Sequence, residues 1–142
     1  MSTLSQETMA TVESTAPILE EHGLAITTHF YGRLFKEYPD VEPMFSGDGL
    51  QPERLAGAVL AYAQNIRNLE ALGPAVERIA VKHVEAGVQA LHYDIVGELL
   101  LGSMVEVLGE IDIAVVEAWG EAYEFLANIF IEAEAAKYAA AS

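Results

Sequence analysis

The sequence predicts a single all-α domain of six or seven helices. Apolar residues recur at helical spacing, as at Ile26, Phe30 and Leu34, whereas no segment shows the two-residue alternation of a surface strand. Proline and glycine recur where helices should end and short loops should follow. With 142 residues and a hydrophobic fraction of 52%, the chain is long enough to build one packed core.

Two helices are expected before the first long connector. The first opens at Ser5 and runs to about residue 21, with Pro17 as a kink and Gly23 as its stop. The second runs from residue 24 to about residue 38, because Pro39 pushes the residue before it away from helical geometry.

A compact connector should occupy residues 39–50, with a turn at residues 46–49. Pro52 then suits the first turn of the next helix, where its missing N–H is not needed. The remaining helices are expected at residues 52–68, 73–90, 93–108 and 111–140.

The net charge of −15 arises from 22 acidic residues against seven basic ones. Such a field repels nucleic acid and anionic lipid, so we expect neither as a partner. A solvated surface is the simplest explanation of the acidic excess, with docking to a basic redox partner or a salty habitat as alternatives. Because the sequence contains no cysteine, disulfides, thiolate nucleophiles and cysteine-bound metal centres are excluded.

The sequence carries no signal for secretion or membrane insertion. Its first eight residues lack a basic region followed by an apolar core. The most apolar stretch, residues 95–107, contains Glu98 and Glu106 and is too short to span a bilayer. We therefore expect a cytoplasmic protein.

His83 is the first candidate for chemistry. It shares a predicted helix face with Ile79, Ala80 and Gly87. The simplest interpretation is a buried histidine bonded to the backbone. The alternative is an axial ligand to haem iron, since neutral imidazole is a strong nitrogen donor and Gly87 leaves room for a macrocycle one turn later. No two histidines share one helix at the usual metal-ligand spacing, so a zinc site is not expected.

Glu134 extends the apolar stripe of Trp119, Tyr123 and Phe130 on the last predicted helix. A carboxylate on an apolar face is costly unless it has a partner. One interpretation is that the helix has reached solvent at this point. The other is that Glu134 accepts a hydrogen bond behind an iron-bound histidine and makes that ligand more electron-donating.

Three further residues are ambiguous when taken singly. Tyr31 lies near the apolar stripe of its helix and is either a core tyrosine or a hydroxyl aimed at bound dioxygen. Phe45 is a plain core candidate. Gln51 could merely cap the helix that starts at Pro52.

Five segments together resemble one family of proteins. They are TTHFYGRLF at 27–35, QNIRNL at 64–69, PAVERIAVKH at 74–83, HYDIVG at 92–97 and AWGEAY at 118–123. In this order they closely resemble the single-domain bacterial haemoglobins and the globin domain of the flavohaemoglobins, over essentially the whole chain. The resemblance implies one globin domain over residues 1–142 that holds haem b, iron protoporphyrin IX.

The resemblance also implies roles for individual residues. His83 falls at the proximal iron ligand of the family. Tyr93 and Glu134 fall at the pair that forms hydrogen bonds around that histidine and gives it an electron push. Tyr31 matches the distal tyrosine that donates to bound oxygen, and Gln51 matches the distal glutamine.

The resemblance implies that four more positions shape the pocket. Leu55 matches the leucine that crowds the ligand, and Phe45 matches the phenylalanine that wedges against the macrocycle. Lys82 and Arg54 are candidates for holding the haem propionates. Because Arg54 replaces a residue that is usually small, its long side chain could instead reach the bound ligand, although we favour the propionate.

The function that the resemblance favours first is reversible binding of dioxygen at a pentacoordinate haem iron, for storage or for delivery to a terminal oxidase. The alternative is a nitric oxide dioxygenase that converts nitric oxide and oxygen to nitrate. A sensor or a minor peroxidase is a third and weaker interpretation. The sequence has no dinucleotide-binding fingerprint. The electrons for nitric oxide dioxygenation would therefore come from a separate flavin or NAD(P)H reductase. Both a monomer and a homodimer are compatible with the sequence.

Overall fold

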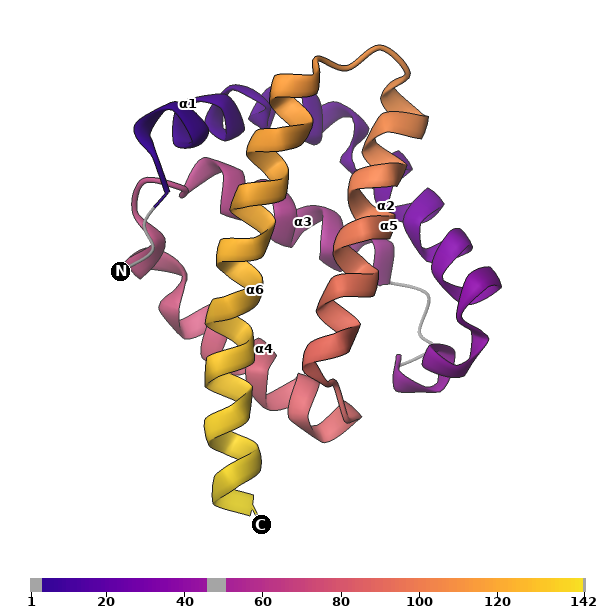
Figure 1. Ribbon diagram of the computed structural model, residues 1–142, viewed down its shortest axis with the longest axis vertical. Coiled ribbons are helices and arrows are strands. Elements are labelled where there is room, and N and C mark those ends of the chain that lie inside the picture. Colours follow the sequence, from indigo (N-terminus) through magenta and orange to yellow (C-terminus); the bar gives the residue numbers. More distant parts are fainter. Residues whose placement is uncertain (1–3, 46–50, 142) are drawn as a thin grey trace.

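The computed structural model describes residues 4–45 and 51–141, and all regular structure within these ranges is helical (Figure 1). Six α-helices and two short 3-10 helices occur there, which confirms the all-α prediction. The turn expected at residues 46–49 lies outside the described residues. The elements are α1 (Gln6–Ser14), α2 (Ala16–Glu37), η1 (Pro39–Met44), α3 (Gln51–Gln64), η2 (Leu69–Leu72), α4 (Gly73–Ala86), α5 (Ala90–Leu108) and α6 (Ile113–Ala141).

The first predicted helix is two helices, so the expectation of one kinked helix is wrong. α1 ends at Ser14, where the N–H of Thr15 donates back to the carbonyl of Val12 at 3.0 Å. Pro17 lies in the first turn of α2, where a residue without an N–H loses no hydrogen bond. The proline therefore begins a helix instead of kinking one.

The predicted helix stop at Gly23 is also wrong, because α2 continues through this residue without a break. A Cβ atom added to this buried glycine would lie 3.6 Å from the Cβ atom of Ala56 on α3. Such a distance is an ordinary van der Waals contact, so Gly23 lies where α2 packs on α3, but the packing does not require a glycine there. One turn later, the hydroxyl of Thr27 donates to the carbonyl of Pro52 at 2.8 Å and holds the start of α3 against α2.

The end of α4 is set by a glycine and comes earlier than predicted. α4 ends at Ala86, not near residue 90, because Gly87 adopts a left-handed conformation with a φ angle of 86°. The N–H of Val88 then turns back and donates to the carbonyl of His83 at 2.9 Å. The last turn of α4 is thereby closed by the two residues that follow it.

α5 begins earlier than the sequence predicts, three residues before Tyr93. Its first residue is Ala90, and the preceding Gln89 forms a capping box with His92. The side-chain nitrogen Nδ1 of His92 accepts from the N–H of Gln89 at 2.8 Å. Tyr93 therefore lies inside the first turn of a capped helix, which fixes the direction in which its side chain leaves the backbone.

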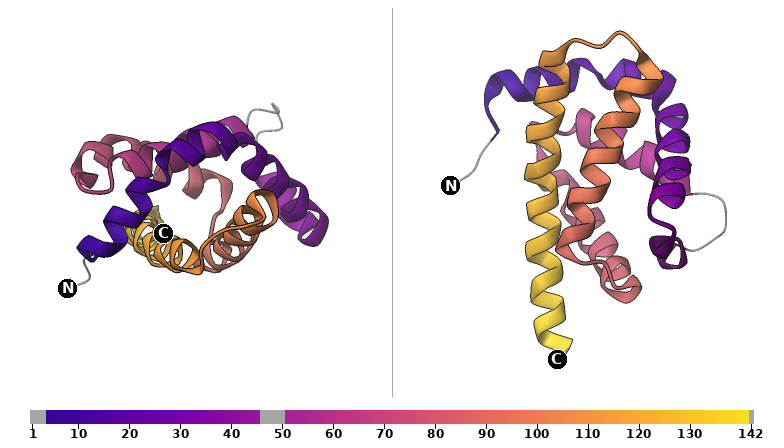
Figure 2. Two further views of the ribbon diagram at one scale, coloured as in Figure 1. Left: turned by 90° about the horizontal axis from the view of Figure 1, so that it is seen from above. Right: turned by 45° about the vertical axis from the view of Figure 1, so that its right-hand side comes forward.

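α5 and α6 run antiparallel and stand in front of α3 and α4, with α2 beside them (Figures 1 and 2). α1 crosses one end of this arrangement and packs on α6. Two buried polar contacts join distant parts of the core. The hydroxyl of Tyr62 donates to the carbonyl of Ala122 at 2.7 Å, and the indole N–H of Trp119 donates to Thr15 Oγ1 at 3.0 Å.

The helices in the described part of the chain do not have the length and apolarity that a bilayer span requires. This agrees with the expectation for residues 95–107, which lie within α5. The two glutamates in that stretch, Glu98 and Glu106, are both exposed. α5 is thus a core helix with one solvated face.

Replacing Gly97 on α5 with alanine should destabilise the fold. The added Cβ atom would lie 2.6 Å from ring carbon Cε2 of Tyr123, and the ring is held because its hydroxyl donates to the carbonyl of Tyr93 at 2.6 Å. We expect the free energy of unfolding of the haem-free chain, measured in urea, to fall by about 1–3 kcal/mol, as for other overpacked cores.

Gly57→Ala is the matched control for this substitution. Gly57 also lies inside a helix, α3, but no neighbouring atom lies within 4 Å of its added Cβ. This variant should gain about 0.5–1 kcal/mol from the higher helix propensity of alanine. Equal effects of the two substitutions would contradict the packing explanation.

Candidate functional site

His83 lies in the last turn of α4, at a point where three helices meet. Its ring nitrogen Nδ1 is 2.9 Å from the hydroxyl oxygen of Tyr93 on α5 and 2.9 Å from Oε2 of Glu134 on α6. The side chain of His83 is nevertheless 33% exposed. One edge of the ring is therefore held by protein, while another part of the side chain is accessible.

Glu134 is only 3% exposed, so the interpretation that α6 has reached solvent at this residue is wrong. The hydroxyl of Tyr93 lies 2.9 and 2.7 Å from its two carboxylate oxygens and donates to this group. A buried carboxylate costs free energy unless donors satisfy it. Here a phenol and an imidazole do so, which explains why an acidic residue is tolerated on an apolar stripe.

This geometry also determines which nitrogen of His83 carries the proton. The single hydroxyl proton of Tyr93 is directed at Glu134, and a carboxylate can only accept hydrogen bonds. The contact between His83 and Glu134 therefore requires a proton on Nδ1, which donates to the carboxylate. When the ring is neutral with its proton on Nδ1, Nε2 keeps its lone pair and is the nitrogen suited to bind a metal.

Tyr93 is fixed from two directions. Burial, followed by the hydrogen bond to Glu134, raises the pKa of Tyr93 above its ordinary value. The backbone carbonyl of Tyr93 accepts a hydrogen bond from the hydroxyl of Tyr123 at 2.6 Å. Burial likewise raises the pKa of Tyr123. Both phenols consequently remain protonated donors at neutral pH.

Sequence analysis does not single out Phe130 or Tyr123 as site residues, although both contact the group around His83. The ring centroid of Phe130 lies 5.7 Å from that of His83. It lies 6.3 Å from that of Tyr93, with the two rings inclined by only 17°. Phe130 precedes Glu134 by four residues on the same helix face, and this spacing was the available signal for it.

A second cluster forms where α2 meets η1, and it brings together the predicted distal residues Tyr31 and Phe45. Their ring centroids are 5.4 Å apart in an edge-to-face arrangement, and Phe35 lies 5.3 Å from Phe45. Burial raises the pKa of Tyr31 to about 12, and the positive charge of Arg54 opposes this effect. The guanidinium group of Arg54 therefore acts on Tyr31 from the first turn of α3.

The other predicted site residues lie on α3 and α4. Gln51 is the first residue of α3 and is partly buried. Leu55, one turn later, is partly buried and packs against the core. The side chains of Arg54 and Lys82 are exposed. Roles for these four residues toward haem or its ligand stay predictions.

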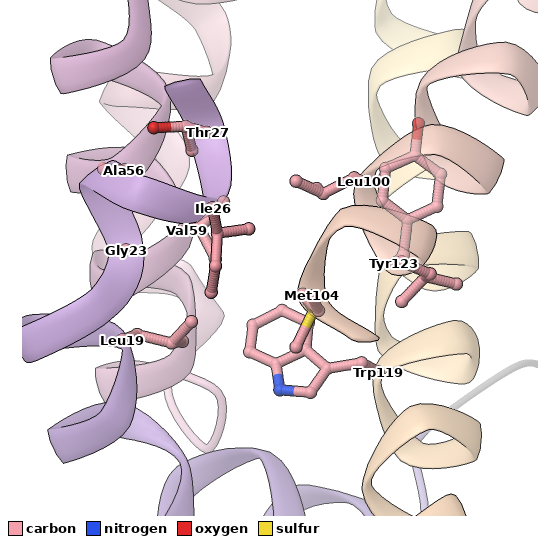
Figure 3. Close-up of a pocket in the computed structure, with 11 residues that line it drawn as sticks. Leu19, Gly23, Ile26, Thr27, Ala56, Val59, Leu100, Met104, Trp119 and Tyr123 are labelled. Atoms are coloured by element: carbon pink, nitrogen blue, oxygen red, sulfur yellow. The ribbon is translucent and has the colours of Figure 1, made fainter. Parts of the chain in front are cut away.

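An apolar cavity lies inside the bundle, with α2 and α3 on one side and α5 and α6 on the other (Figure 3). Its free volume of about 20 Å³ is on the order of one water molecule. Leu100, Met104 and Trp119 form much of its wall. Tyr123, which holds the carbonyl of Tyr93, completes that wall and connects the cavity to the group around His83.

The donor set of these residues fits an axially bound haem. His83 offers an imidazole nitrogen whose opposite ring nitrogen is bonded to a buried carboxylate, an arrangement typical of metal-binding histidines. Tyr31 offers a buried hydroxyl set among aromatic rings in a separate cluster. A histidine is one of the side chains that hold haem iron, and the polarity and hydrogen-bond donors of the opposite pocket decide how oxygen is handled there.

Comparison with known proteins gives a consistent result. The globin family model matches residues 28–130. A flavohemoprotein of Halalkalibacterium halodurans is 48% identical over 145 residues, which cover 99% of this chain and 35% of that protein. A candidate nitric oxide dioxygenase from Rhodothermus marinus, engineered as a carbene transferase, is 40% identical with a TM-score of 0.91, and the match covers 97% of this chain and 98% of that one.

A flavohemoglobin of Malassezia yamatoensis, solved with bound FAD and heme, is 34% identical with a TM-score of 0.88. The match covers 97% of this chain and 38% of that protein. The chain thus spans little more than a third of the length of either flavin-containing relative. The matched region is nevertheless most of the present chain, and it includes His83 and Tyr93. The chain therefore belongs to the globin family, a family of haem-binding proteins.

Proposed function

We propose that this globin binds haem b through His83 and catalyses the dioxygenation of nitric oxide. In this reaction one nitric oxide, one dioxygen and one electron give one nitrate ion. Haem, when bound, would supply the iron chemistry that activates oxygen. The electron comes from a flavin reductase outside the globin fold, and the net charge of −15 offers a docking field for a basic partner.

The observation that carries this proposal is the contact of the buried Glu134 carboxylate with Nδ1 of His83, at 2.9 Å. A full negative charge behind the imidazole makes it a stronger electron donor than a backbone carbonyl would. Such a ligand favours the ferric state and pushes electron density toward the opposite face. This property supports a reaction with turnover more than simple storage of oxygen. Lys82, next in sequence to His83, and Arg54 would hold the propionates.

On the opposite face, Tyr31 would donate a hydrogen bond to the ligand. Phe45, which packs edge-on against Tyr31, would wedge against the macrocycle. Gln51 would be a second donor, and Leu55 would limit the space around the ligand. Because burial raises the pKa of Tyr31 to about 12, this phenol stays a donor throughout the physiological pH range.

The relatives support dioxygenation better than the oxygen-carrier function that the sequence alone places first. The Rhodothermus marinus protein, a candidate nitric oxide dioxygenase, matches over nearly its whole length. The Halalkalibacterium halodurans relative is a flavohemoprotein, and the flavohemoglobin of Malassezia yamatoensis was solved with both FAD and heme bound. Oxygen binding is common to both functions, and only the subsequent fate of the oxygen differs.

Nitric oxide consumption by the haem-loaded chain tests the proposed function. With a flavin reductase and NADPH present, we expect nitric oxide to disappear and one nitrate to form for each electron supplied. Without the reductase, each oxygenated protein molecule should form one nitrate, and nitrate formation should then stop. If the oxygenated protein persists in the presence of nitric oxide and forms no nitrate, oxygen carriage is the better function.

Glu134→Gln should raise the ferric–ferrous midpoint potential, because a neutral amide donates less electron density through His83 than a carboxylate does. We expect a rise of about 60 mV, equivalent to a tenfold change for a one-electron couple, measured by spectroelectrochemistry. Glu132→Gln is the control, because it removes the same charge from an exposed position on the same helix. Equal shifts in both variants would point to long-range electrostatics and away from a specific contact.

Tyr31→Phe should speed the release of oxygen from the ferrous protein by about 2- to 10-fold, the expected effect of losing one hydrogen bond. Tyr38→Phe, at a residue 37% exposed, is the control and should release oxygen at the wild-type rate. Stopped-flow measurement of oxygen release gives both rates. An unchanged rate in Tyr31→Phe would remove this residue from the mechanism.

The effect of Tyr31 on the rate of oxygen release should also depend on pH. The pKa of Tyr31 is raised from 10.0 to about 12, so the neutral phenol persists above the pH at which a free tyrosine ionises. The contribution of Tyr31 to oxygen retention should therefore be constant from neutral pH to about pH 10 and should be lost only as the pH approaches about 12. A contribution that declines near neutral pH would mean that another group provides the hydrogen bond.

A further inference from the structure

The last turns of α6 contact the corner between α4 and α5, directly behind His83. The hydroxyl of Tyr138 donates to the carbonyl of Val88 at 2.6 Å. Tyr138 follows Glu134 by four residues, so the two side chains leave the same face of α6 one turn apart. Tyr138 is partly buried, and its partner is a backbone atom of a short loop with no regular structure.

Val88 is joined to His83 through the backbone. Its N–H donates to the carbonyl of His83 at 2.9 Å, across the left-handed Gly87. The peptide groups of Val88 thus receive one hydrogen bond from α6 and donate another to the residue that carries the imidazole. This series of contacts is independent of the bonds that Glu134 and Tyr93 make to the ring itself.

We propose that Tyr138 is a positioning residue for His83: it fixes the backbone of the proposed iron ligand, while Glu134 fixes its ring. This inference rests on the proposed role of His83 as the axial ligand. An imidazole held only at Nδ1 can still pivot about that bond if its backbone moves. Two points of attachment, one on the ring and one on the backbone, remove that freedom and fix the orientation of the ring and the position of Nε2.

A second contact near the end of α6 makes it possible to distinguish positioning of His83 from simple attachment of α6 to α4. Lys137 forms an ion pair with Glu77, on the early part of α4. This pair also ties α6 to α4, but it does so away from the corner at Val88. If Tyr138 only attaches the end of α6, loss of the ion pair should have the same consequences as loss of the Tyr138 hydroxyl.

The test uses Tyr138→Phe in the full chain, with two kinds of readout that do not depend on turnover: NMR of the haem-free protein, including amide exchange, and resonance Raman of the haem-loaded protein. In the haem-free protein, we expect the ring signals of His83 in nitrogen NMR to broaden or split. The amide of Val88 should also exchange with solvent about 2- to 10-fold faster, as for one lost hydrogen bond. In the haem-loaded ferrous protein, the iron–histidine stretching band in resonance Raman should shift or broaden.

Three other variants complete the design. Tyr62→Phe removes the same kind of bond, a buried tyrosine hydroxyl to the carbonyl of Ala122 at 2.7 Å, and should leave both readouts unchanged. Lys137→Met should also leave them unchanged. Gly87→Ala strains the same corner through its φ angle of 86° and should shift both readouts, which gives a second route to the result if Tyr138→Phe folds poorly.

Two results would overturn the proposal. One is that His83 signals and the stretching band are unchanged in a folded Tyr138→Phe variant or, if that variant does not fold, in Gly87→Ala. The other is that Tyr62→Phe or Lys137→Met changes them as much as Tyr138→Phe does. If the wild-type chain takes up no haem, the proposed function fails, and the NMR and exchange readouts still decide whether Tyr138 positions His83.

Discussion

The burial of one carboxylate is the constraint on which this site depends. Glu134 is 3% exposed on α6 and needs hydrogen-bond donors, which Nδ1 of His83 and the hydroxyl of Tyr93 provide. Since these donors lie on α4 and α5, satisfying one charge fixes the relative positions of three helices. The same contact places the proton of His83 on Nδ1 and leaves Nε2 available to a metal. The relative placement of these three helices and the orientation of the His83 ring therefore depend on the same carboxylate.

The contacts around this carboxylate extend the same constraint along α6. Tyr123 packs against Gly97 so closely that a Cβ atom has no room there, and its hydroxyl fixes the carbonyl of Tyr93. Phe130 packs against the rings of both His83 and Tyr93. Tyr138 reaches the corner after α4. Successive turns of α6 thus contact the backbone of α5, the two rings and the backbone next to the histidine.

The sequence predicts the helices well and the site only in part. Helical periodicity places α3, α4, α5 and α6 to within about four residues at each end, but it misplaces the boundary between α1 and α2. The odd position of Glu134 on an apolar stripe marks a residue that needs a partner. Pro17 and Gly23 are misinterpreted because both are helix-breaking residues when judged locally, whereas Pro17 lies in the first turn of α2 and Gly23 lies inside that helix, packed against α3. Tyr138 escapes notice because its partner is a backbone carbonyl 50 residues away, which no periodicity reveals. The expected role of Tyr31 comes from the resemblance to bacterial globins and not from its pattern.

The group around His83 and the cluster around Tyr31 differ in how many helices contribute to them. This difference has a functional consequence. The group around His83 draws on α4, α5 and α6 and contains a buried charge, so any substitution there disturbs packing and ligand chemistry together. Tyr31 and Phe45 instead meet by ring contacts at one corner between α2 and η1. Loss of the Tyr31 hydroxyl leaves those ring contacts in place, because a phenylalanine ring occupies the same space. Under the proposed function, the group around His83 would set how strongly the iron is supplied with electron density. The cluster around Tyr31 would then be free to change which ligand is retained, and for how long, without disturbing that group.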